Sequence, residues 1–279
     1  MTFSGHDTFH CRLFWLKKGF DFIQNGENFQ DDSGVYLGVG KNMVNSIRFW
    51  LKAFGITNAD ELPTELFENL LQENGWDPYL ENEGTLWLLH YKLCSVNYAS
   101  IYSLIFKELR KIKPEFTKSN FLELALEKAP TTSDKIINKD FSVFIRTYMD
   151  KHENTKEDSL SGLLTELNLL SEIRKNELKE TVYRIENSNA NSLPCEIILY
   201  CILENENYGD SISFKSFYND EKGIGHIFVL TPEQLEDKLG EITARFPDIR
   251  YSNEAGVKVL QIKNRPNSLD VLNTYYNEA

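Results

Sequence analysis

The sequence predicts a mainly α-helical fold with small β-hairpins, and three observations support this prediction. Apolar residues recur at helical spacing in several segments, for example over 101–112. The clearest helix start is Thr231-Pro232-Glu233-Gln234, which combines an N-cap threonine, a proline at the first helical position and a capping-box glutamine. Two short strands are expected after that helix, over 249–252 and 257–262. Helices followed by a terminal hairpin are the element order of a winged helix.

The remaining segments extend this picture and divide the chain. Further helices are expected after Asn120, as an N-cap, and after Thr131-Thr132-Ser133. Polar stretches at 151–158 and 186–192 resemble linkers. We therefore expect three parts, which are an N-terminal helical region with a helix-turn-helix (1–130), a middle helical block (131–186) and a C-terminal winged-helix-like region (187–279).

Composition limits the class of protein. The 279 residues are 41% hydrophobic and 26% charged, which is typical of a globular chain. The longest apolar run, Ile197–Leu203, is far shorter than the roughly 20 residues of a membrane span. The first residues lack a basic and an apolar region, so we expect no signal peptide and a cytoplasmic location. The four cysteines form no C-x-x-C pair and are expected to be reduced structural thiols.

The segment 37–52 carries the pattern of a DNA-reading helix, although the net charge of −12 disfavours non-specific DNA binding. Gly38 and Gly40 indicate a turn, and the preceding helix of the pair is expected over 12–24. Lysine, arginine and asparagine at its outer positions suit phosphates and base edges. The candidate nucleic-acid-binding residues are Lys41, Asn42, Asn45, Arg48 and Lys52.

This segment has two other interpretations. A phosphate-binding loop requires four residues between its first glycine and Gly-Lys, whereas one residue separates Gly38 from Gly40-Lys41, so we exclude it. An ordinary amphipathic helix with a solvated polar face stays open.

The N-terminus concentrates chemically active side chains, and the candidate catalytic residues are His6, Asp7, His10 and Arg12. His6 and His10 at i and i+4 would share one helical face and, with Asp7, offer metal ligands. Alternatively, a histidine acts as general base and Arg12 as a phosphate clamp. The third interpretation is structural, with His6 and Asp7 capping the first helix and His10 packed among aromatic residues.

Two further stretches have strongly biased charge. Residues 53–91 contain eight acids and no lysine or arginine, which indicates a solvated face or a docking surface for a basic partner. A divalent-cation site at Asp77, Glu81 and Glu83 is the alternative there. The stretch from Lys107 to Lys118 has five bases and two acids, and would either extend a DNA-binding track or form a solvated helix end.

Three sequence motifs stand out together. They are Phe3-Ser4-Gly5-His6-Asp7-Thr8-Phe9, then Leu37-Gly38-Val39-Gly40-Lys41-Asn42-Met43-Val44, then Asp77-Pro78-Tyr79-Leu80-Glu81 with Thr85-Leu86-Trp87-Leu88-Leu89-His90. In this combination the chain resembles the bacterial domain-of-unknown-function 4007 family over nearly its whole length. Asp7 stands where the family is expected to have glutamate. The resemblance implies a protein of DNA phosphorothioation and related defence gene clusters, in which some relatives nick DNA. It also implies partners, namely a sulfur-transfer reductase-like enzyme, a cysteine desulfurase and an ATPase.

The sequence thus predicts a DNA-binding component of a bacterial phosphorothioation or defence system. Whether it is an enzyme that nicks one strand, with a divalent metal such as Mg²⁺ or Mn²⁺, is left open, as are the metal and the oligomeric state. The alternative is a non-enzymatic adaptor or transcriptional regulator that binds DNA and recruits partner proteins.

Overall fold

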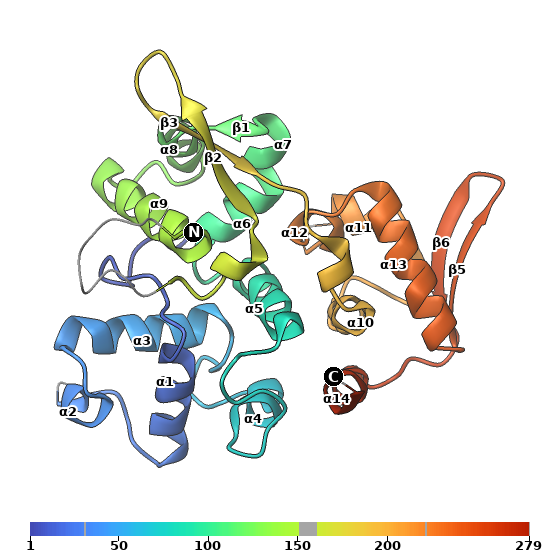
Figure 1. The fold of residues 1–279 in the computed structure, drawn as a ribbon, viewed down its shortest axis with the longest axis horizontal. Coiled ribbons are helices and arrows are strands. Elements are labelled where there is room, and N and C mark those ends of the chain that lie inside the picture. The colour runs from blue at the N-terminus through green and yellow to red at the C-terminus, as the bar shows by residue number, and fades with distance from the viewer. Residues whose placement is uncertain (31, 151–160, 221, 279) are drawn as a thin grey trace. The chain divides into compact units, whose positions relative to one another are not determined.

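The computed structural model describes residues 1–30, 32–150, 161–220 and 222–278, which form two compact units (Figure 1). Unit 1 comprises Met1–Glu81 and Lys92–Glu186, and unit 2 comprises Asn82–Tyr91 and Asn187–Ala279. About half of the chain is helical, and the described residues include two three-stranded sheets. The fold is therefore mixed α/β, a correction to the mainly α prediction. The linker expected at 151–158 lies outside the residues described.

Unit 1 begins with helices that pack on one another through large apolar side chains, and Phe20, Trp50 and Phe67 are almost fully buried. These helices are α1 (Trp15–Gln24), α2 (Ser33–Leu37), α3 (Lys41–Ala53) and α4 (Glu65–Leu71). Helix α5 (Glu83–Val96) contributes its first residues to unit 2 and its last to unit 1.

The rest of unit 1 contains a sheet and the helices that cover it. The elements are α6 (Ser100–Ser103), η1 (Leu104–Leu109), α7 (Arg110–Ile112), β1 (Glu115–Phe116), α8 (Lys118–Lys128), α9 (Asp134–Tyr148), η2 (Thr165–Leu167), β2 (Leu170–Lys175) and β3 (Thr181–Ile185). The antiparallel sheet has the order β1-β3-β2, with Phe116 opposite Tyr183. Phe116 and Tyr183 also contact Phe141 of α9, so this helix is packed against the sheet.

Unit 2 repeats the same order of elements. It contains η3 (Ala190–Ser192), α10 (Cys195–Leu203), β4 (Ser211–Ser213), α11 (Ser216–Asn219), α12 (Ile224–Ile227), α13 (Pro232–Arg245), β5 (Ile249–Glu254), β6 (Val257–Ile262) and α14 (Ser268–Glu278). The sheet order is β4-β6-β5. Both units thus have a helix, a strand, a helical segment, a long helix and a hairpin, and in both the last strand lies between the other two.

Capping residues explain several helix starts. Thr231 and Gln234 form the expected capping box of α13. Helix α8 differs from the prediction, because Thr117 is its N-cap and Asn120 is the partner at the third helical position. Helix α2 was not predicted, and it ends at Gly38, whose φ of 61° is the left-handed conformation that glycine adopts without strain. None of the described helices combines the length and apolarity needed to cross a lipid bilayer.

Candidate nucleic-acid interface

His6 lies in the interior of unit 1 and holds the N-terminal segment against α9. Its Nε2 atom is 3.1 Å from Oδ1 of the buried Asp140. The same carboxylate accepts hydrogen bonds from the backbone N–H of Ser4 at 3.0 and 2.9 Å. The His6 ring stacks on Trp50 with centroids 6.0 Å apart, and Ser46 of α3 donates to the His6 carbonyl oxygen at 2.7 Å. This geometry gives His6 an anchoring role.

The segment anchored by His6 has an unusual backbone. Ser4, Asp7 and Thr8 have φ values of 76°, 44° and 73°, a region that residues other than glycine seldom occupy. Gly5 has a φ of 108°, and a Cβ atom there would lie 2.6 Å from the Phe49 ring. Asp7 is exposed, and its Oδ2 atom is 3.5 Å from Nδ2 of Asn45.

The four candidate catalytic residues differ in exposure. His6 and His10 are buried, Asp7 is exposed, and Arg12 is half-buried with its guanidinium 5.2 Å from the centre of the Trp15 ring. Residues 3–11 form no helix, so the expectation that His6 and His10 share one helical face is wrong. The turn-rich path of the segment, with its left-handed residues, is the reason.

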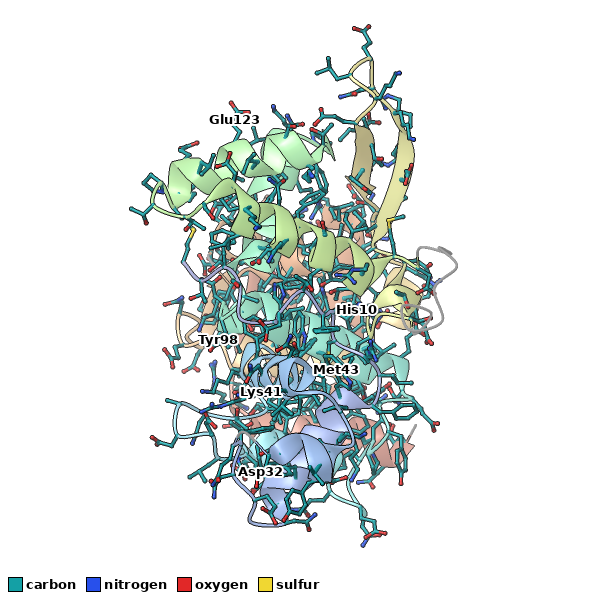
Figure 2. The ribbon with its side chains drawn as sticks, turned by 90° about the vertical axis from the view of Figure 1, so that its left-hand side faces the viewer. His10, Asp32, Lys41, Met43, Tyr98 and Glu123 are labelled. Atoms are coloured by element: carbon teal, nitrogen blue, oxygen red, sulfur yellow. The ribbon has the colours of Figure 1, made fainter. Side chains whose placement is uncertain are left out.

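The polar stripe of α3 faces outward as expected, but two of its cations meet a carboxylate. Arg48 and Lys52 form ion pairs with Glu61 at 2.5 and 2.6 Å. Partial burial would raise the pKa of Glu61, but the hydrogen bonds and charges of Arg48 and Lys52 outweigh burial and hold that pKa below its ordinary value. The positive charge of this half of the stripe is therefore partly compensated. Lys41, at the start of α3, is exposed (Figure 2), and so is Asn42 after it.

Helix α9 carries a second polar stripe that the sequence analysis did not identify. Lys135, Lys139, Ser142 and Arg146 are spaced i, i+4, i+7 and i+11, the same spacing as Lys41, Asn45, Arg48 and Lys52. We call these four residues, with the half-buried Asn138, the α9 stripe. It contains no carboxylate. Among the described residues, no carboxylate forms an ion pair with Lys135 or Lys139.

The α9 stripe lines a groove of about 390 Å³ that also receives Thr8 and Lys118. Arg146 donates hydrogen bonds to the carbonyl oxygens of Ser142 and Thr8, so the anchored N-terminal segment borders the groove. The groove thus gathers four cations and three neutral polar side chains from the N-terminal segment, α8 and α9.

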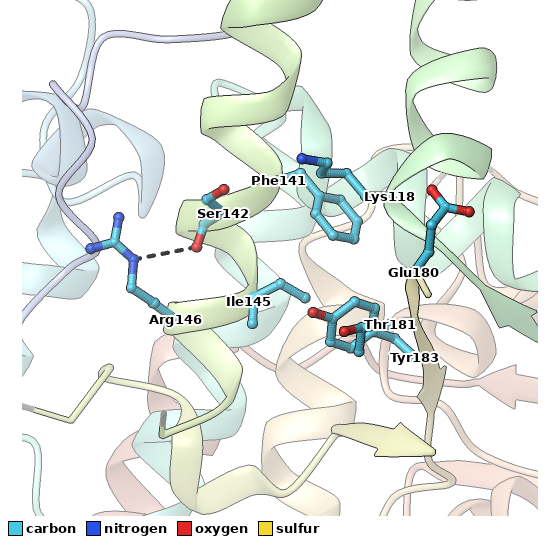
Figure 3. A pocket seen from close by; sticks show the side chains of 8 residues that line it. All are labelled: Lys118, Phe141, Ser142, Ile145, Arg146, Glu180, Thr181 and Tyr183. Atoms are coloured by element: carbon cyan, nitrogen blue, oxygen red, sulfur yellow. Dashed lines mark hydrogen bonds between the residues drawn. The ribbon is translucent and has the colours of Figure 1, made fainter. Parts of the chain in front are cut away.

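A second groove continues from the α9 stripe to the hairpin (Figure 3). Ser142 and Arg146 lie on one side of it, and Thr181 and Tyr183 of β3 lie on the other. The acid that lines it, Glu180, is already engaged. Hydrogen bonds from Ser119 and Asn176 and, more weakly, the charge of Lys118 hold the pKa of Glu180 below its ordinary value.

Clustered metal ligands do not occur in the part of the chain that the structure describes. No group of three or more His, Cys, Asp or Glu side chains there is placed to hold an ion. Asp77, one of the carboxylates considered for a cation, is buried and accepts a hydrogen bond from the Glu81 backbone N–H at 3.0 Å.

Comparison with known proteins identifies the family. The sequence model described as "Protein of unknown function (DUF4007)" matches residues 3–276. A solved structure described as "SspB crystal structure" is 27% identical, with a TM-score of 0.86, and the match covers 99% of this chain and 88% of that one. A magnesium ion-bound SspB structure is 28% identical over the same shares, with a TM-score of 0.85. No protein with a curated description matches the chain. The chain belongs to the DUF4007 family.

Proposed function

We propose that this protein is a duplex-DNA-binding component of a bacterial DNA phosphorothioation or related defence system. The observation that carries the proposal is the α9 stripe, because its Lys135 and Lys139 are exposed and form no ion pair with a carboxylate among the described residues. Lysine and arginine neutralise phosphates, and Asn138 has the two hydrogen-bonding groups that match adenine. The system itself, a cytoplasmic location and partners such as a reductase-like enzyme and an ATPase rest on the family resemblance.

The position of α9 in its unit supports this function. Part of unit 1 follows the element order of a winged helix: a helix over 100–112 (α6, η1 and α7), then β1, α8, α9, β2 and β3. The central position of β3 in the sheet fits that topology. In a helix-turn-helix the second helix of the pair enters the major groove. Here that helix is α9, preceded by α8, so the α9 stripe occupies the reading position.

The equivalent helix of unit 2 has the opposite charge. Helix α13 follows the same winged-helix order, but its partly or fully exposed positions carry Glu233, Glu236, Asp237 and Glu241. Glu236 and Glu241 are ion-paired with Lys258 and Lys238, but Glu233 and Asp237 are exposed, and they would repel phosphates from this face. We therefore assign duplex binding to unit 1, and α13 offers a control of matched topology.

The α3 stripe is retained as a second contact in the proposal. Lys41, Asn42 and Asn45 are exposed and not bound to Glu61, whereas Arg48 and Lys52 share Glu61. Lys41 and Asn42 belong to the first turn of α3, and N-terminal residues of a helix are the ones that reach base edges in helix-turn-helix docking.

The experiment that tests DNA binding is a salt titration with a fluorescently labelled duplex. Phosphate contacts from Lys118, Lys135 and Lys139 alone predict that log Kobs falls with log salt concentration with a slope of about −2.7, and any further phosphate contact makes the slope steeper. An affinity that is absent at low salt, or that does not depend on salt, contradicts the proposal.

Strand nicking is the finer proposal for the N-terminal residues. The support is the strained backbone at Asp7 and Thr8, because Thr8 lines the cationic groove and such strain is common at functional sites. Asp7 is the exposed member, and His6 would act by anchoring the segment. We expect the protein to relax supercoiled plasmid with Mg²⁺ or Mn²⁺, and Asp7→Ala, His10→Ala and Arg12→Ala to lose this activity. Relaxation that persists in His10→Ala and Arg12→Ala contradicts this site.

An adaptor role is the second candidate, and one surface favours it. Phe14, Tyr36 and Tyr79 line a groove of about 460 Å³ in unit 1, and they are 60%, 69% and 56% exposed. Exposed aromatic side chains that share a groove are typical of protein interaction sites. DNA binding without plasmid relaxation by the wild-type protein is the result expected of an adaptor.

A further inference from the structure

The turn between β2 and β3 presents a leucine to solvent. Leu178 is 80% exposed at the apex of this hairpin. In both views the turn projects beyond the helices of its unit (Figure 1, Figure 2). Exposing a leucine at the end of a projecting hairpin gains nothing for the fold, because the side chain is not removed from water there. A contact outside the chain would explain the residue.

Hydrogen bonds close the turn and hold the leucine in place. The backbone N–H groups of Asn176 and Lys179 donate to the carbonyl oxygens of Glu180 and Asn176, each at 2.9 Å. The Asn176 side chain accepts from the Glu180 N–H at 2.9 Å and donates to the Glu180 carboxylate at 3.1 Å. Binding through Leu178 would therefore cost little ordering of the turn.

Cations lie on both sides of the leucine. Lys175 and Lys179 are exposed, and neither is ion-paired to a described residue. Glu180 is turned toward Ser119, which leaves Glu177 as the exposed acid of the turn. An apolar apex between two lysines suits a DNA groove, where apolar side chains wedge between base pairs and lysines contact the flanking phosphates.

We propose that the β2–β3 turn is a wedge that enters the minor groove of duplex DNA and kinks it, with Leu178 between two base pairs. This inference rests on the proposed function, since the groove of Ser142 and Arg146 leads from α9 to the base of this hairpin. The ligand is a duplex with a flexible pyrimidine–purine step, which kinks at low cost.

The test measures the bend by energy transfer between dyes at the two ends of a duplex with a central TA step. A fluorescent base analogue at that step reports unstacking. We expect the wild-type protein to bend the duplex by about 20–90° and to raise the fluorescence of the analogue. Leu178→Ala should still bind but lose both signals, and Leu178→Met should keep them. Val257→Ala, at the 63% exposed position in the hairpin of unit 2, should also keep them.

Two results would overturn the wedge. One is wild-type protein that binds the duplex without bending it. The other is a bend in Leu178→Ala equal to that of the wild type. Failure of the wild-type protein to bind at all would remove the proposed function together with the wedge, so the wild-type affinity distinguishes the two failures.

Discussion

Replacing Lys135 and Lys139 by alanine is expected to weaken duplex-DNA binding about 60-fold at 0.1 M salt. Each lysine that contacts a phosphate contributes about 0.9 to the slope of log Kobs against log salt, so the double variant should have a slope less steep by about 1.8. This contribution vanishes near 1 M salt, which gives a factor of about 10^1.8 at 0.1 M. Both side chains are exposed, so the fold should be unaffected.

The matched control is Arg48→Ala with Lys52→Ala on α3. It removes two cations at equivalent spacing, but these two are ion-paired with Glu61. The slope should change less than in the α9 variant, because a compensated cation displaces fewer counterions. Fluorescence anisotropy titrations at about 0.05 to 0.3 M salt, where log Kobs falls linearly with log salt concentration, measure this slope for each variant. A larger loss in the α3 variant would make α3 the main DNA contact.

Replacing Asp140 by alanine is expected to destabilise unit 1 by about 3–5 kcal/mol. The carboxylate is 2% exposed and is bonded to His6 and to the backbone of Ser4. Its removal leaves these polar groups in the interior without their partner, and a buried polar group without a partner is costly. For a unit of this size the midpoint of thermal unfolding should fall by roughly 6–20 °C.

Asp140→Asn is the control for that variant. Its amide oxygen still accepts from the Ser4 N–H, so it should lose clearly less stability than alanine. Calorimetry of the full chain measures both variants. Equal stability of the alanine variant and the wild type would show that the N-terminal segment is not anchored through His6.

Local chemistry explains which elements were predictable. The α13 cap needs only Thr231 and Gln234, three residues apart, so the sequence suffices to find it. Strand β1 has two residues, too few to show alternation, and it is a strand only because β3 lies beside it. Strands β2 and β3 are longer, with six and five residues, but they were not predicted either, so the sheet of unit 1 is absent from the mainly α prediction.

Local sequence patterns also cannot show that the charges of Arg48 and Lys52 are compensated by an acid. Glu61 lies 13 residues after Arg48, in a turn with a φ of 63°, and only the folded chain brings the two together. The α9 stripe was not predicted, although the spacing of Lys135, Lys139 and Arg146 along one helix face can be read from the sequence. The contact between His6 and Asp140 could not be predicted from the sequence, because the two residues are 134 positions apart.

The claim that the outer face of α9 contacts DNA is tested most directly by site-specific crosslinking. All four native cysteines are buried, so a cysteine introduced at the exposed Ser142 can be labelled selectively with a photo-crosslinker. Irradiation with a labelled duplex should give a protein–DNA adduct from Ser142→Cys that decreases as salt rises. Asp237→Cys, on the acidic face of α13, should give none. Bound DNA that crosslinks at Asp237→Cys and not at Ser142→Cys would contradict the account.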